Sequence, residues 1–315
     1  MAAAWRDSVR LLAGLGFIRR LILIMLSAMS VHFAQPGSAM ANSIYFQGAD
    51  VALQRGVDAD SPSAIAAALA HGASVNARER EVGGTILDYA VAQFRNRAVE
   101  ALLQAGADPN LRDLAGDNAV TLAVRAYAKD PQPLAMVLAH GGDPNTFSPY
   151  GYYVIHRFLA DRNFAGLDLL VKYGADLNVR QPSAQPPNDG GNWMADRPFG
   201  GWDMKGGPPE ILYAARASNW DVVLKMLQLG AKFDYPDEPV TFPDLFKGRA
   251  GTFPPPDSWL YYYKLKCYEF MKAHGLKLPP FGPGAGGSDG APADWTLPPG
   301  PDPFAHEFSS NPKAG

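Results

Sequence analysis

Two short glycine-rich motifs near the C-terminus are the residues most suggestive of chemistry. Gly282-Pro-Gly284-Ala-Gly-Gly287 fits a dinucleotide-binding fingerprint, and Gly286-Gly-Ser288-Asp-Gly290 fits the elbow that carries a nucleophilic serine. The first motif needs a preceding strand and a following helix to aim backbone N–H groups at a pyrophosphate, and the second needs a strand–turn–helix that exposes the serine. Proline and glycine surround both motifs, so these elements are not expected. The sequence therefore predicts no catalytic residues and no cofactor.

The histidines and the single cysteine do not predict a metal site. His71, His140 and His274 each end an apolar helical segment, where a cation complements the helix dipole. Neighbouring helix layers lie about 8–10 Å apart, so the first two would be roughly 20 Å apart, and metal ligands lie only about 2 Å from the metal. His306-Glu307 lacks the second histidine of a zincin helix. Cys267 lies in an apolar, aromatic segment, which indicates a buried inert thiol.

The charge of the chain gives no reason to expect nucleic acid. Its 315 residues hold 28 Lys+Arg and 31 Asp+Glu, a formal charge of −3, whereas phosphate binding needs a basic face. Hydrophobic residues make up 47%, which is enough to bury a core. One cysteine excludes an internal disulfide.

The N-terminal segment 1–41 has the pattern of a secretory signal peptide. Residues 1–20 hold four arginines and one aspartate, an apolar segment follows from Leu21, and Ala39-Met-Ala41 supplies a cleavage site before Asn42. The alternative is an uncleaved anchor that reaches back through residues 11–18, which would have to bury Arg19 and Arg20. With cleavage the chain is periplasmic or secreted, is not membrane-bound and has a charge of −6.

A turn phrase recurs five times, at a nearly constant period except for one longer interval before the last copy. The copies are Gly72-Ala-Ser-Val-Asn76, Gly106-Ala-Asp-Pro-Asn110, Gly141-Gly-Asp-Pro-Asn145, Gly174-Ala-Asp-Leu-Asn178 and Gly230-Ala-Lys-Phe-Asp234. Each glycine follows an apolar helical segment and can end it in the left-handed conformation. Three residues before the glycines stand Leu69, Leu103, Leu138, Val171 and Leu227, which we expect to form a buried column.

A second phrase, Thr85-Ile-Leu-Asp-Tyr-Ala90, precedes the best copy, and His156 keeps the histidine that this phrase has in its full form. At these residues the sequence resembles the ankyrin repeat, from about residue 49 to residue 234. The resemblance implies an all-α solenoid of about five helix–turn–helix units. Ser258–His274 is expected to add a capping helix, so that the repeat domain spans residues 42–278.

Glycine and proline concentrate in three places outside the units. An insert, Gln181–Gly207, separates the fourth and fifth units and contains Trp193, Phe199 and Trp202. It either binds a partner or folds back onto the solenoid. Residues 234–257 hold six prolines and are expected to form an irregular connector. The tail, residues 279–315, is expected to be disordered.

The resemblance implies a monomeric, non-catalytic module that binds a protein partner outside the cytoplasm through the loop tips and first helices of its concave side. The residues expected to bind are Arg78, Glu79, Arg80, Arg112, Asp113, Tyr150, Tyr152, Arg180, Trp193, Phe199 and Trp202. Two alternatives stay open. The chain could be an envelope stabiliser tethered by its tail, or an enzyme with its site in the insert and the connector.

Overall fold

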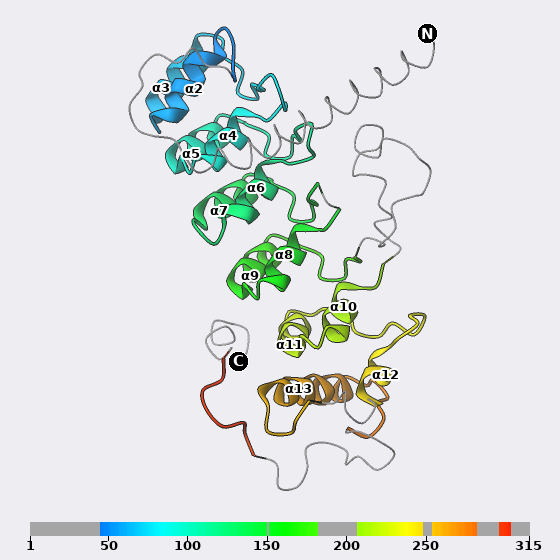
Figure 1. Cartoon of the computed structure of the whole chain (residues 1–315). Helices are drawn as coiled ribbons and strands as arrows, with labels where there is room; N and C mark the ends of the chain where they lie inside the picture. The colour runs from blue at the N-terminus through cyan, green and yellow to red at the C-terminus, as the bar shows by residue number, and fades with distance from the viewer. Residues whose placement is uncertain (1–44, 150, 182–206, 248–253, 282–295, 304–315) are drawn as a thin grey trace, which may run out of the picture.

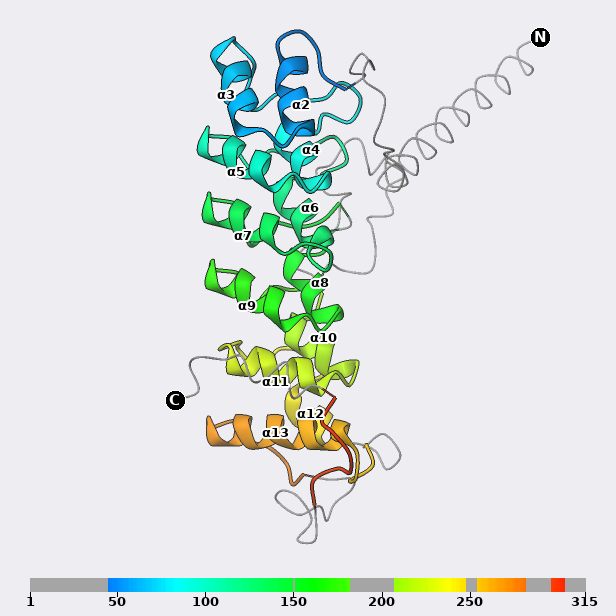
Figure 2. The ribbon, with the colours of Figure 1, turned by 90° about the vertical axis from the view of Figure 1, so that its left-hand side faces the viewer.

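The computed structural model describes residues 45–149, 151–181, 207–247, 254–281 and 296–303. These ranges contain twelve helices and no β-strand, and the helices form six pairs stacked in chain order (Figures 1 and 2). The first helices of the pairs are α2 (Asp50–Asp58), α4 (Ile86–Ala92), α6 (Ala119–Ala126), α8 (Val154–Ala160), α10 (Glu210–Arg216) and α12 (Phe242–Lys247). The second helices are α3 (Pro62–Ala70), α5 (Asn96–Gln104), α7 (Gln132–Ala139), α9 (Phe164–Lys172), α11 (Trp220–Gln228) and α13 (Trp259–Ala273). The chain is the all-α solenoid that its repeat predicts.

Local signals in the sequence set where the helices begin and end. Thr85 caps α4 in a reciprocal box with Asp88, and Asn118 caps α6 in the same way with Thr121. Each second helix ends at a glycine whose φ lies between +88° and +94°, a conformation that L side chains rarely adopt. These glycines are Gly72, Gly106, Gly141, Gly174, Gly230 and Gly275. The capping unit therefore ends its second helix as the five other units do.

The core includes two columns of side chains on the second helices that repeat through all six units. They stand four and seven residues before each glycine, and no member is more than 6% exposed. The columns are Ala68, Leu102, Val137, Leu170, Met226 and Met271, and Ile65, Val99, Leu134, Leu167, Val223 and Tyr268. The column predicted three residues before the glycine is less uniform, because Leu69 and Val171 are only half-buried. The helical period places that position at the edge of the buried face.

A ladder of asparagine side chains joins the turn of each unit to the next. The side-chain Oδ1 atom accepts the backbone N–H that lies two residues after the glycine of the following unit. The pairs are Asn76 with Asp108 (2.9 Å), Asn110 with Asp143 (2.8 Å), Asn145 with Asp176 (2.7 Å) and Asn178 with Lys232 (2.7 Å). In two units the asparagine Nδ2 also donates to the next glycine's carbonyl, so each turn fixes the position of its neighbour.

Ion pairs join the fourth unit to the fifth. The Arg162 Nε atom lies 2.6 Å from Asp221 Oδ2, and the Lys225 ammonium lies 2.8 Å from Asp168. The Lys225 and Asp221 side chains are almost fully buried. Burying a charge is costly unless it is paired, so these contacts keep the two units in register where the chain between them is longest.

The connector and part of the tail are built into the capping unit. Residues 234–257 were expected to be irregular, but they contain α12, whose Phe242 and Phe246 are buried. Beyond the expected end at residue 278, Phe281 is 1% exposed and its ring lies 5.0 Å from that of Tyr268. Further on, the Tyr263 hydroxyl donates to Asp302 at 2.8 Å. These aromatic contacts extend the packed unit to at least Phe281. In the described part of the chain, no helix combines the length and the apolar character needed to cross a bilayer.

Truncation of the core column tests this packing. Leu134→Ala removes a side chain with 0% exposure, so we expect it to lower the free energy of unfolding in urea by about 2–5 kcal/mol. Leu114→Ala is the matched control, because Leu114 is 79% exposed at a loop tip and its loss should change stability by less than about 0.5 kcal/mol. Equal effects of the two substitutions would contradict the core assignment.

Candidate functional site

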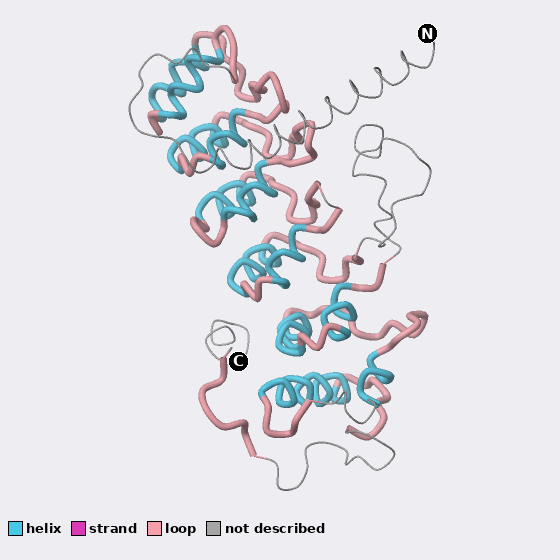
Figure 3. Tube along the Cα trace, viewed as in Figure 1, coloured by secondary structure: helices cyan, strands magenta, loops and turns pink. Residues whose placement is uncertain are grey.

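The loops between units project to one side of the stack, next to the first helices (Figure 3). The first helices α4, α6, α8 and α10 lie on that side and the second helices lie on the other (Figure 1). The concave face is the surface formed by these loops and first helices. All the predicted binding residues that the structure describes lie on it.

Three arginines that are predicted to bind a partner brace the loops within the chain. The Arg78 guanidinium donates to the carbonyl of Gly83 in its own loop at 2.5 Å, and to the carbonyl of Arg112 in the next loop at 2.8 Å. The Arg112 guanidinium likewise donates to the carbonyl of Phe147 in the next loop at 3.0 Å, and it lies 4.5 Å from the centre of the Phe147 ring. Arg180 donates to the Gly207 carbonyl at 2.8 Å and pairs with the carboxylate of Glu238 in the following loop. The Nη1 atom of each of these arginines is therefore used within the chain.

The acidic residues predicted beside them have similar roles. Glu79 accepts the backbone N–H of Val82, and Asp113 accepts that of Asp117 at 2.8 Å. Burial raises the pKa of Asp113.

Arg80 has an exposed side chain near the start of the stack. Of the other predicted residues, Tyr152 lies on the concave face, whereas Tyr150, Trp193, Phe199 and Trp202 lie outside the described residues.

The insert leaves and re-enters the solenoid at a closed loop base. Arg180 and Pro209 form an antiparallel bridge, and the Gln181 N–H donates to the Pro208 carbonyl at 3.0 Å. The Gly207 backbone packs so closely on Gln181 that a Cβ atom there would lie 2.1 Å from the Gln181 carbonyl oxygen. The insertion proper is therefore residues 182–206, and the residues at its two ends keep the geometry of an ordinary loop.

A cluster of exposed aromatic side chains lies directly beside this base. The Tyr152 ring stacks on the His156 ring, with their centroids 4.7 Å apart and their planes at 22°. The edge of the Tyr213 ring meets the same histidine at 6.1 Å. Tyr152 and Tyr213 are 37% and 47% exposed, so these three residues, the Tyr–His–Tyr cluster, present aromatic surface to solvent.

A buried carboxylate holds the cluster in place. Glu210, at the start of α10, is 3% exposed, and its Oε1 atom lies 2.8 Å from His156 Nδ1. Its other oxygen accepts a hydrogen bond from the Gln181 side-chain amide. These two hydrogen bonds offset the free-energy cost of burying the carboxylate. The imidazole ring is thus fixed between two tyrosines, and the cluster is suited to stacking and hydrogen bonding with a surface that docks on it.

Four of these five residues were not predicted as site residues. His156 carried a signal, because it keeps the histidine of the repeat phrase. Tyr213 occupies the place on α10 that Tyr89 occupies on α4. No sequence signal pointed to Glu210 and Gln181, because these residues meet only when the two ends of the insert come together, and no local pattern encodes that closure.

A family model of the ankyrin repeat matches residues 82–114. The match covers the second unit, from the tip of one loop to the tip of the next, where the Leu114 N–H donates to the Val82 carbonyl at 2.7 Å. The chain is an ankyrin-repeat protein. Ankyrin repeats mediate protein–protein interactions and are typically non-catalytic. The aromatic cluster therefore lies on the face that such repeats use for binding.

The histidines and the cysteine have structural environments in this ankyrin-repeat protein. The Nδ1 atoms of His71, His140 and His274 each lie 2.7–3.0 Å from the carbonyl oxygen four residues earlier in their own helices. Cys267 is fully buried, where burial raises the pKa of its thiol, and its Sγ atom donates to the Trp220 carbonyl. Within the described ranges, no three His, Cys, Asp or Glu side chains come together as a group that could hold a metal.

Asp88 is a buried carboxyl group on α4, at the place that His156 takes on α8. One oxygen accepts the Thr85 N–H at 2.8 Å, while Oδ1 has no hydrogen-bond partner in the described part of the chain. Burial raises the pKa of Asp88 to about 7, against the opposing effect of its hydrogen bonds with Thr85. The protonated form therefore predominates below pH 7.

This pKa predicts a pH dependence of stability. Because the pKa is higher in the folded chain than the ordinary value of about 3.9, protonation stabilises the fold. The contribution of Asp88 to the free energy of unfolding should therefore fall as the pH rises from about 4 to about 7. Asp88→Asn removes this contribution, so the stability of wild type relative to the variant should increase from pH 7 to pH 5 in urea titrations. Asp108→Asn, at an exposed turn, is the control, and the same pH trend in both variants would contradict the assignment.

Proposed function

We propose that this ankyrin-repeat protein is an exported, non-catalytic module that holds an extracytoplasmic protein on its concave face. The Tyr–His–Tyr cluster is the observation that carries the proposal. Tyrosine is enriched among the residues that dominate binding energy in protein interfaces. Tyr213 is 47% exposed and packs against His156, which Glu210 holds in place. A side chain that is already held in place loses little entropy on binding.

The place of the cluster in the stack also supports this proposal. The loops that follow the first and second units are braced by contacts of Arg78, Arg112 and Asp113 within the chain. At the fifth unit the first helix instead presents Tyr213, and the insert at 182–206 begins and ends next to it. We propose that the insert adds contacts to the same partner.

Export is proposed from the pattern of the segment 1–41, which lies outside the described ranges. The basic segment, the apolar segment and the Ala-Met-Ala site favour cleavage before Asn42. An intact mass that begins at Asn42, measured on the chain isolated from its producing cells, would support this, and retention of residue 1 would overturn it.

Site-specific crosslinking at Tyr213 tests the binding face. A photoreactive phenylalanine analogue at this position, in the full chain inside its native cells, should trap one protein that mass spectrometry then identifies. The same analogue at Gln104, which is exposed on the second helix α5, should not trap that protein. Trapping of the same protein at both positions would mean that the concave face does not select it.

Affinity measurements with the identified partner then test the cluster itself. Tyr213→Ala and Tyr152→Ala should each weaken binding at least tenfold, which corresponds to about 1.4 kcal/mol or more. Leu260→Ala on α13 is the control, because this side chain is 39% exposed but lies away from the cluster. Replacement of residues 182–206 by a short Gly-Ser link should also weaken binding and leave the helical circular dichroism intact. Unchanged affinity in both tyrosine variants would overturn the proposal.

The alternative of an envelope stabiliser tethered by its tail is less well supported. The described residues of the tail contact the capping unit, through Phe281 on Tyr268 and through the Tyr263 hydroxyl on Asp302. A tether that begins at residue 279 would not need these contacts. Truncation after Leu278 that abolished localisation but left partner binding unchanged would favour this alternative.

A further inference from the structure

The asparagine ladder ends one step before the stack does. Asp234 occupies in the fifth unit the position of the four ladder asparagines. If the ladder continued, the Asp234 side chain would accept a hydrogen bond from the backbone N–H of Lys277, two residues after Gly275. The Asp234 side chain is exposed, and within the described residues its carboxylate makes no hydrogen bond and no ion pair. It also carries a charge that the asparagines lack.

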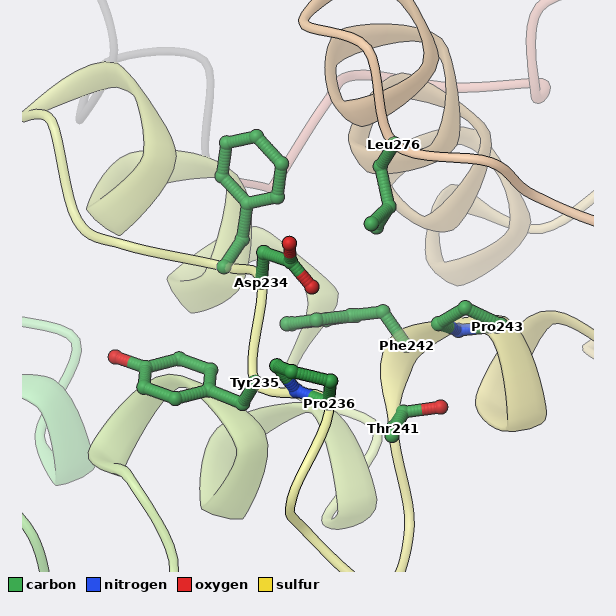
Figure 4. Close-up of a pocket in the computed structure, with 8 residues that line it drawn as sticks. Asp234, Tyr235, Pro236, Thr241, Phe242, Pro243 and Leu276 are labelled. Atoms are coloured by element: carbon green, nitrogen blue, oxygen red, sulfur yellow. The ribbon is translucent and has the colours of Figure 1, made fainter.

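A cavity of about 280 Å³ lies where this last contact would be. Its walls are mainly apolar and come from three segments: the turn with Phe233 and Pro236, the start of α12 with Phe242 and Pro243, and Leu276 after α13. Figure 4 shows the Asp234 carboxylate directed into the space between the Phe242 ring and Leu276.

Two other polar side chains line this cavity. The Tyr235 hydroxyl is buried without a hydrogen-bond partner among the described residues, and Figure 4 shows it directed away from the Asp234 carboxylate. The Thr241 hydroxyl donates to Asp244 at 2.7 Å, and Asp244 also lies 3.4 Å from the Lys247 ammonium. Among the lining residues, Asp234 is the one that carries a charge, and a ligand that bonds its exposed carboxylate must donate hydrogen bonds. A positive charge would strengthen these bonds.

We propose that this cavity binds an arginine side chain of a partner protein. A guanidinium group is planar, donates two parallel hydrogen bonds to a carboxylate and stacks on aromatic rings, and the cavity offers a carboxylate beside two phenylalanine rings. The aliphatic part of the arginine packs on the prolines and Leu276. Small-molecule sites are usually about 300–1,000 Å³, so a cavity of this size suits one side chain better than a larger ligand. This site does not involve the Tyr–His–Tyr cluster and can be tested without the partner of that cluster.

Binding of a single blocked amino acid tests the proposal. Nα-acetyl-arginine methylamide is titrated into the full chain, with the methyl signals of Leu276 observed by NMR. We expect these methyl signals to shift until the site is saturated, with a Kd on the order of 1 mM, which corresponds to a binding free energy of about −4 kcal/mol. The citrulline analogue has the same shape without the charge and should bind at least tenfold more weakly.

Two variants assign the effect to the carboxylate. Asp234→Asn restores the residue type of the other units, keeps the size of the side chain and should weaken arginine binding at least tenfold. Asp237→Asn, at an exposed position outside the cavity, is the control and should leave the Kd unchanged. Equal affinity of wild type and Asp234→Asn, or equal affinity for arginine and citrulline, would overturn the proposal. Self-association of the chain that disappears in Asp234→Asn would assign the cavity to a second copy and would also overturn it.

Discussion

No unit of this protein can bury its own apolar face, and this constraint organises the structure. Each helix pair is short, and its core residues, such as Leu134 and Leu167, are removed from water only when neighbouring pairs stack on them. Stacking requires that successive turns keep the same spacing. The asparagine ladder supplies this, because each turn side chain bonds the backbone of the next turn at 2.7–2.9 Å.

The same constraint determines which surface remains for function. Arg78, Arg112 and Arg180 near the loops donate hydrogen bonds within the chain, which helps to keep the units in register. Free aromatic surface appears where the regular loops are interrupted, at the insert, and an unpartnered carboxylate appears where the ladder stops, at Asp234. Both candidate binding sites are thus departures from the repeat rather than parts of it.

The repeat and its boundaries could be predicted because they depend on local signals. Glycine at the helix ends, the turn asparagines and the apolar spacing each act within a few residues. The short helix α12 was missed, because six prolines in its segment hid the spacing of Phe242 and Phe246. The bracing contacts of Arg78, Arg112 and Arg180 were not predicted, because a charged residue near a loop tip gives no sign of the carbonyl that it meets in another segment. The cluster at Glu210 depends on closure of a long insert, which the sequence does not encode locally.

Hydrogen exchange at one rung tests the ladder most directly. Asn110→Ala removes the acceptor of the Asp143 N–H and leaves the bond from the Asp176 N–H to Asn145 in place. A hydrogen bond of this kind contributes about 0.5–1.5 kcal/mol, so exchange of the Asp143 amide should become up to about tenfold faster, while that of Asp176 changes little. No change at Asp143, or equal acceleration at both amides, would contradict the claim that each unit is joined to the next through its own asparagine.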